Sequence, residues 1–202
     1  MKKNFILLIL TLTLFSCSPA NRKLNSFKQS RSLKLSKTVI IKDNMFFSDM
    51  QSSVKGGLNS LLGDVLANSM DNKKEKFIKV MIENNINIEN IVLKSANKEL
   101  KKAGINNSDN SEFEIKFIVR LYGFGQRQGL SKKLKPIMVI EAKISDNNNE
   151  IVFKDIENIT TFNSKTKHYE IDEYIKDYNK INAALEGVAS IAISNILKNL
   201  NS

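Results

Sequence analysis

The residue types that most often carry enzymatic chemistry are scarce in this chain. Its 202 residues include one cysteine, Cys17, and one histidine, His168. A single cysteine excludes an internal disulfide framework and multi-cysteine metal sites, and a single histidine excludes paired-histidine zinc motifs. His168 could act as a general base only beside a nucleophile and an orienting acid, and the sequence places neither there. We therefore expect a protein that is not an enzyme and that uses no metal and no cofactor.

Two pairs of carboxylates share a strand face, Glu112 with Glu114 and Asp155 with Glu157. Paired carboxylates can hydrolyse glycosides. Alternating charge is, however, the usual pattern on the outer face of a strand, and we interpret both pairs in that way.

The one glycine-rich segment runs from Leu121 to Gly129. Its glycines follow the spacing GxGxxxG and lead into a basic stretch and a strand, whereas a dinucleotide-binding loop has GxGxxG and leads into a helix. The Gly-Lys-Ser/Thr of a P-loop is absent. We expect a hairpin end that exposes Tyr122 or Phe124 in a basic contact surface for headgroups or a protein. Its predicted members are Tyr122, Phe124, Arg127, Lys132, Lys133 and Lys135. A solvated hairpin loop is the alternative.

The N-terminus has the layout of a secretory signal. Lys2 and Lys3 precede an eleven-residue apolar run from Phe5 to Phe15. This run is too short to cross a bilayer, which takes about 20 helical residues. A positive region followed by a short apolar region is typical of a signal peptide. It ends at Leu14-Phe15-Ser16-Cys17, so the single thiol of the chain directly follows the signal.

Leu14-Phe15-Ser16-Cys17 resembles the lipobox of bacterial lipoproteins, with Phe15 bulkier than the family's usual residue. The resemblance implies cleavage of a signal peptide, residues 1–16, by signal peptidase II. It also implies a diacylglycerol on Cys17 and a further acyl chain, such as palmitate, on the new amine. Ser18, in place of an Asp, implies transport to the outer membrane of a Gram-negative cell. The absence of a following acidic run implies that the protein faces the periplasm. An ordinary signal peptide with a chance cysteine is the alternative.

The formal net charge of +10 becomes +8 once residues 1–16, with two lysines and no acid, are removed. The segment 17–37 contains six cations and no acid. We expect a lipidated basic tether that is extended or disordered. It would lie along the membrane or meet an acidic partner, or serve as a plain spacer. We expect no nucleic-acid partner, because an exported protein rarely meets one.

The remainder, 38–202, is predicted to form a single α+β domain. We expect two layers: an antiparallel meander plus a short N-terminal strand, packed by three helices from the N-terminal half and one long C-terminal helix. The predicted strands are 38–41, 112–122, 137–145 and 150–162, and the predicted helices are 49–69, 73–83, 87–103 and 170–200. Asn87 is the predicted N-cap of the third helix, and Gly104 follows its end.

This order of elements loosely resembles the small periplasmic auxiliary lipoproteins of ABC-type transport systems. The resemblance implies a lipid-anchored protein of the cell envelope that acts by binding, as an auxiliary or scaffold of an envelope or transport complex. Its expected contacts are the membrane, through the lipid on Cys17, and a protein partner in the envelope, with lipid as a further candidate ligand. The alternative is a surface-exposed lipoprotein that binds host or extracellular polyanions.

Overall fold

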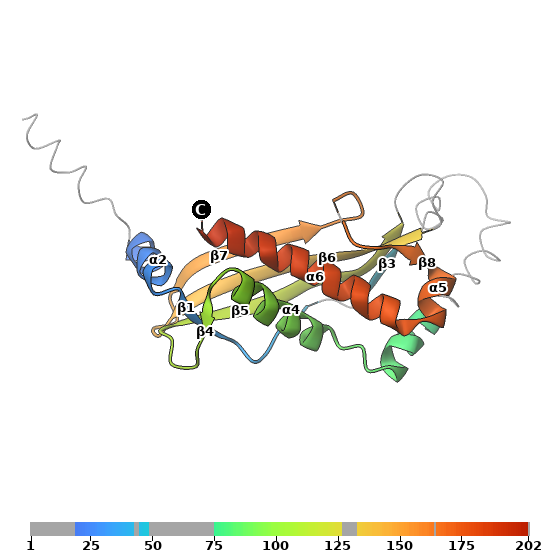
Figure 1. Ribbon diagram of the computed structural model, residues 1–202, viewed down its shortest axis with the longest axis horizontal. Helices are drawn as coiled ribbons and strands as arrows, with labels where there is room; N and C mark the ends of the chain where they lie inside the picture. The colour runs from blue at the N-terminus through green and yellow to red at the C-terminus, as the bar shows by residue number, and fades with distance from the viewer. Residues whose placement is uncertain (1–18, 43–44, 49–74, 127–132, 164, 202) are drawn as a thin grey trace, which may run out of the picture.

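The computed structural model describes residues 19–42, 45–48, 75–126, 133–163 and 165–201, and Figure 1 shows their arrangement. The predicted helix over 49–69 lies outside these residues. The described chain is a two-layer α+β fold in which a long C-terminal helix packs on a mixed sheet. The predicted fold class is therefore confirmed.

The predicted antiparallel meander forms the centre of the sheet. It consists of β5 (Phe113–Gln126), β6 (Lys133–Asp146) and β7 (Ile151–Ile159). The β5–β6 pair extends to Gln126 and Leu134, well beyond the predicted strand ends at 122 and 137. Short strand β8 (Tyr169–Glu170) pairs with the start of β6. The Asp146 carboxylate accepts the backbone N–H groups of Asn148 and Glu150 and so closes the predicted turn before β7.

The other edge of β5 is covered by three short strands in succession. They are β1 (Ser32–Leu35), β2 (Ile40–Ile41) and β3 (Phe46–Ser48), and each runs parallel to β5. β4 (Asn106–Asn107) pairs with the outer side of β1. The predicted strand at 38–41 corresponds to β2, so this edge is longer than expected in both directions.

The expected tether is largely folded, which corrects the prediction for 17–37. Its residues form α2 (Pro19–Ser30) and β1. Phe27 and Leu33 are almost fully buried, and Lys23 forms ion pairs with Asp146 and Glu150 at the β6–β7 turn. A few well-spaced apolar side chains thus outweigh the high charge of the segment, because each reaches the domain core. Folded structure is therefore present from Pro19 onward, well before residue 38.

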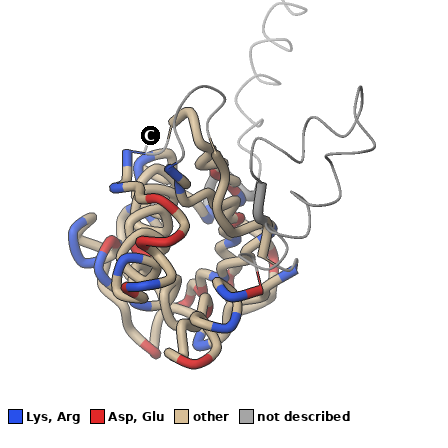
Figure 2. Tube along the Cα trace, turned by 90° about the vertical axis from the view of Figure 1, so that its right-hand side faces the viewer, with Lys and Arg blue, Asp and Glu red and all other residues tan. Residues whose placement is uncertain are grey.

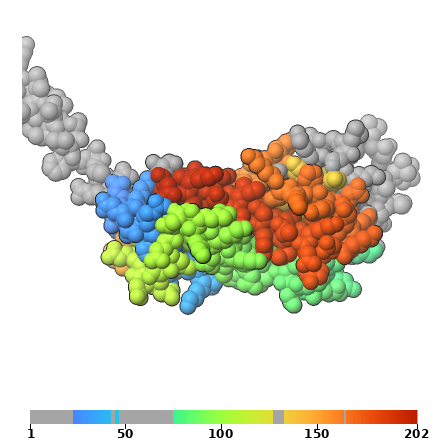
Figure 3. All heavy atoms as spheres, in the orientation of Figure 1, coloured from blue at the N-terminus to red at the C-terminus, as the bar shows by residue number. Residues whose placement is uncertain are grey.

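The helices form the second layer. A helix over 75–83, α4 (Ile88–Lys102), α5 (Ile171–Lys176) and α6 (Tyr178–Asn201) lie on one side of the sheet, and α6 contacts α4, β6 and β7 (Figures 1 and 3). The Asn87 side chain accepts the backbone N–H of Asn90, which confirms the predicted N-cap. Gly104 has a φ of 67° just beyond the end of α4, as a C-terminal glycine should.

The predicted single C-terminal helix is interrupted at Asp177. This residue is extended, with φ −138° and ψ 91°, and it ends α5. Its carboxylate accepts the backbone N–H of Asn179, 3.1 Å away, at the start of α6. An aspartate that caps a new helix favours this break over a continuous helix.

Candidate functional site

The structure corrects the predicted exposure of Phe124 in the basic contact surface. Phe124 is fully buried, with ring centroids 4.9 Å from Phe77 and 5.0 Å from Tyr174. The Tyr174 hydroxyl donates a hydrogen bond to the Leu134 carbonyl, 3.2 Å away. These contacts place Phe124 in the domain core, where it cannot meet a partner.

Tyr122 is half-buried and packs against the core, whereas an outward position was expected from simple alternation. The register shifts between Val119 and Leu121, so that Arg120 forms a β-bulge. One extra residue exchanges the two faces of the strand from that point on. Burial accordingly raises the pKa of the Tyr122 hydroxyl.

Of the remaining predicted site residues, the structure describes Lys133 and Lys135. Cys17, Arg127 and Lys132 lie outside the described residues. Lys133 is exposed at the start of β6, and Lys135 is half-buried opposite Gly125. The correction thus concerns Tyr122 and Phe124, and the basic part of the predicted surface stays a prediction.

A different surface of the sheet gathers charge. The helices cover one face, and no described helix packs on the other, which we call the helix-free face. Strand alternation and register assign side chains to it. They include Lys34, Glu114, Lys116, Ile118, Arg120, Lys143, Glu141, Lys154, Ile40 and Ile156. Figure 2 shows that charges of both signs are spread widely over the chain, so the grouping on this face comes from the register rather than from composition.

Three lysines form a row across the helix-free face. Lys116 on β5 is directly opposite Lys143 on β6, which is directly opposite Lys154 on β7. Lys116 and Lys154 are exposed, and Lys143 is half-buried. Like charges in directly opposite positions destabilise a sheet. Repulsion within the row therefore destabilises the sheet unless nearby carboxylates neutralise the lysines.

Glu141 is the main carboxylate that reduces the repulsion within the lysine row. Its side chain is fully buried, and one carboxylate oxygen accepts a hydrogen bond of 2.5 Å from Nε of Arg120. The other oxygen, Oε1, lies 3.4 Å from Nζ of both Lys143 and Lys154 but accepts no hydrogen bond from a side chain or backbone. Lys116 pairs instead with Glu114 at 3.1 Å. Four cations thus share two carboxylates.

The charge state of Glu141 follows from these neighbours. Desolvation alone would raise the pKa of this carboxyl. The hydrogen bond and charge of Arg120, together with Lys154 and Lys143, outweigh desolvation and hold the pKa below its ordinary value. Glu141 is therefore ionised at neutral pH and anchors the three cations on the sheet.

An apolar row lies next to the lysine row. Ile40, Ile118 and Ile156 share a line across β2, β5, β6 and β7, in which Glu141 occupies the β6 position. Ile118 is buried, whereas Ile40 is 52% exposed and Ile156 is 50% exposed. The helix-free face thus presents aliphatic side chains beside a band of cations.

The acidic pair Asp155 and Glu157 was expected on an outer face, and the structure shows the opposite. The two carboxylates face α6, where they accept hydrogen bonds from the side-chain amides of Asn199 and Asn195 at 2.8 and 3.3 Å. They hold the helix to β7.

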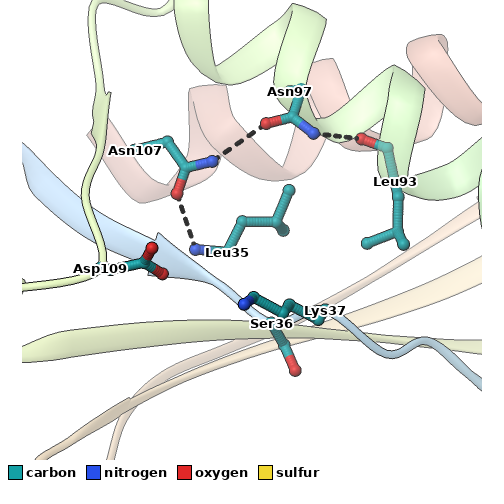
Figure 4. A pocket seen from close by; sticks show the side chains of 7 residues that line it. All are labelled: Leu35, Ser36, Lys37, Leu93, Asn97, Asn107 and Asp109. Carbon is teal, nitrogen blue, oxygen red and sulfur yellow. Dashed lines mark hydrogen bonds between the residues drawn. The ribbon is translucent and has the colours of Figure 1, made fainter.

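A polar pocket of about 340 Å³ lies between β1, α4 and the β4 region. Figure 4 shows how the Asn107 side chain links Asn97 to the backbone N–H of Leu35. Lys37 and Asp109, at its rim, are exposed. The amide groups that line the pocket are already engaged with one another, so the pocket offers few free polar groups to a ligand.

Among the described residues, no cluster of histidine, cysteine and carboxylate side chains could hold a metal ion. Within the same residues, no helix is long and apolar enough to span a bilayer.

Known proteins offer limited comparison. No family model and no curated protein matches the sequence. Among solved structures, a candidate lipoprotein from Caulobacter crescentus is similar with a TM-score of 0.37 and 15% identity, over 55% of this chain and 78% of the other. A minor lipoprotein from Acinetobacter baumannii gives a TM-score of 0.32 and 13% identity, over 54% and 83%. Both likenesses are distant.

Proposed function

We propose that this chain is a lipid-anchored protein of the bacterial cell envelope that acts by binding, as an auxiliary or scaffold of an envelope or transport complex. The observation that carries the proposal is Leu14-Phe15-Ser16-Cys17 at the end of a basic and apolar leader. The single cysteine stands at the one position where a lipobox needs it. Two or more acyl chains there would give stable membrane attachment, which one chain does not.

The position of α2 supports this proposal. The helix starts two residues after Cys17 and packs onto the end of the sheet through Phe27, whose ring lies 5.6 Å from that of Phe113. A lipid on Cys17 would therefore hold the folded domain close to the bilayer, where a partner in the same membrane is within reach.

Metabolic labelling with an alkyne analogue of palmitate tests the anchor. We expect the wild-type chain to incorporate the label and to fractionate with membranes. The Cys17→Ala variant should do neither. Label that persists in Cys17→Ala, or a wild-type protein that stays unlabelled and is released in soluble form, contradicts the proposal.

Ser18 supports an outer-membrane location with the domain facing the periplasm. We expect density-gradient fractionation to place the wild type with outer membranes and the Ser18→Asp variant with inner membranes. Crosslinking in intact envelopes should capture a discrete protein partner. External protease should leave the protein intact, and its digestion in intact cells would instead favour a surface lipoprotein that binds polyanions.

A further inference from the structure

We infer that the helix-free face is a docking surface for an anionic phospholipid layer. The face carries more cations than its own carboxylates neutralise: Arg120, Lys143 and Lys154 surround Glu141 alone, and Lys116 is opposite Lys143. A lysine near an anionic leaflet is attracted to its phosphates. Phosphate groups between Lys116 and Lys154 would also remove the repulsion within the lysine row.

The apolar residues of this face favour lipid over an acidic protein segment. Ile40 and Ile156 are both about half exposed, yet they lie at opposite ends of a row that spans about 14 Å at ordinary strand spacing. Between them stand buried Ile118 and ionised Glu141. A protein interface needs a continuous buried centre, which two separated side chains do not form. Single aliphatic side chains among cations suit the boundary between headgroups and acyl chains.

The orientation of the face relative to the anchor adds to the argument. β1 follows α2 directly, and its Lys34 lies opposite Glu114 in the strand register. On the helix-free face, the row next to these two residues is the lysine row. The cations therefore lie at the end of the sheet where α2 enters the fold. In this respect the inference rests on the proposed function, because it takes the lipid on Cys17 to bring that end to the membrane.

Vesicle sedimentation tests the face without the anchor. A chain that begins at Ser18 keeps every described residue of the hydrophobic core, from Leu24 to Leu200. It carries no acyl chain. We expect it to bind vesicles of phosphatidylglycerol and phosphatidylethanolamine in equal amounts, and to lose this binding in high salt. Vesicles of phosphatidylethanolamine and phosphatidylcholine alone should not retain it.

Two matched double variants distinguish binding through the helix-free face from an effect of net charge alone. Lys116→Gln with Lys154→Gln removes two charges from the row but leaves Arg120 and Lys143 on Glu141. Lys98→Gln with Lys101→Gln removes two exposed charges from α4, on the helical layer. We expect the first pair to weaken binding on the order of tenfold. The second pair should change it less than twofold.

An engineered tryptophan gives a second measurement, because the chain has none. Ile156→Trp should show a blue-shifted emission when phosphatidylglycerol vesicles are added. Ile82→Trp, at a 71% exposed position on the helix over 75–83, should show no shift. Circular dichroism of each variant would verify that the fold is kept.

Three results would overturn the inference: failure of the wild-type domain to bind anionic vesicles, equal loss in the two lysine pairs, or a shift at position 82 rather than 156. Tight binding of polyglutamate without vesicle binding would assign the face to an acidic protein. Competition by inorganic phosphate at equal phosphate concentration would assign it to the free ion. None of these results depends on palmitate labelling, so failure of the anchor and failure of the face are distinguishable.

Discussion

The rings of Phe27 and Phe113 meet edge to face, with centroids 5.6 Å apart and planes at 81°. Phe27 belongs to α2 and Phe113 begins β5, so this contact joins the N-terminal helix to the central strand. Through this contact α2, whose composition is that of a linker, becomes part of the folded domain.

The Phe27→Ala variant should lose about 3 kcal/mol of unfolding free energy, because a buried aromatic ring is replaced by a cavity. Urea unfolding followed by circular dichroism measures the loss. Asn25→Ala, at an exposed position of the same helix, should stay within about 0.5 kcal/mol of the wild type. Equal stability of the two variants would mean that α2 contributes nothing to the folded domain.

Glu141 should make stability depend on pH in a defined direction. Its pKa in the folded chain lies below the unfolded value, so its charge stabilises the fold above the unfolded pKa. This contribution is lost as the pH falls through the folded pKa. We expect Glu141→Gln to lower the urea midpoint at neutral pH, where Arg120, Lys143 and Lys154 lose their shared anion. The difference from the wild type should shrink steadily in acid, below pH 4.5. A difference that is constant from neutral to acidic pH would contradict the ion-pair cluster.

Gly123 is the position at which a methyl group should be least tolerated. Its φ is 151°, and a Cβ would lie 1.8 Å from the backbone carbonyl oxygen of Phe46 on β3. Gly123→Ala must therefore push β3 away from β5, at a cost of about 2 kcal/mol or more. In Gly187→Ala the new Cβ would lie 3.0 Å from a Thr166 methyl group within a helix that favours alanine. Thermal unfolding should show a large loss for the first variant and little change for the second.

Removal of the Asn87 cap of α4 should lower the unfolding free energy by a smaller amount. Its side chain accepts the N–H of Asn90 at 3.2 Å. Asn87→Ala should cost about 1 kcal/mol, and Asn87→Ser should recover most of that loss because serine caps in the same way. Equal loss in both variants, measured by urea unfolding, would argue against a capping role.

The parts of the fold that follow local rules were predictable. Asn87 and Gly104 mark the ends of α4, and the alternation from Glu112 to Val119 marks the start of β5. The bulge at Arg120 has no such signal, because it depends on how β5 pairs with β6. It reverses the faces beyond it and places Phe124 in the core and Leu121 on the other side. The break at Asp177 also escaped prediction, since the apolar stripe continues through it.

The helix-free face could not be seen in the sequence because it is a product of register. Lys116, Lys143 and Lys154 are far apart in the chain and belong to three strands, each with an unremarkable alternation. The tight turn at Asp146 fixes how β6 meets β7. Continued straight from that turn, the register would place Lys143 opposite Phe153. A register shift between Ile144 and Ser145 places it opposite Lys154 instead. The position of Lys116 opposite Lys143 depends on the register between β5 and β6, which the bulge at Arg120 shifts by one residue.

The parallel edge of the sheet has a consequence for the order of folding. β3 is opposite Gly123 of β5, so among the described strands it has no partner until β5 has been made, and until then β1 has only the two residues of β4. α2 likewise cannot pack in its final position before β5 is made, because Phe27 contacts Phe113. Contacts between segments so distant in sequence form slowly. A chain that emerges N-terminus first therefore leaves residues 14–17 joined to unfolded polypeptide for as long as β5 is still to come. An enzyme that processes those residues would meet an open substrate rather than a folded domain.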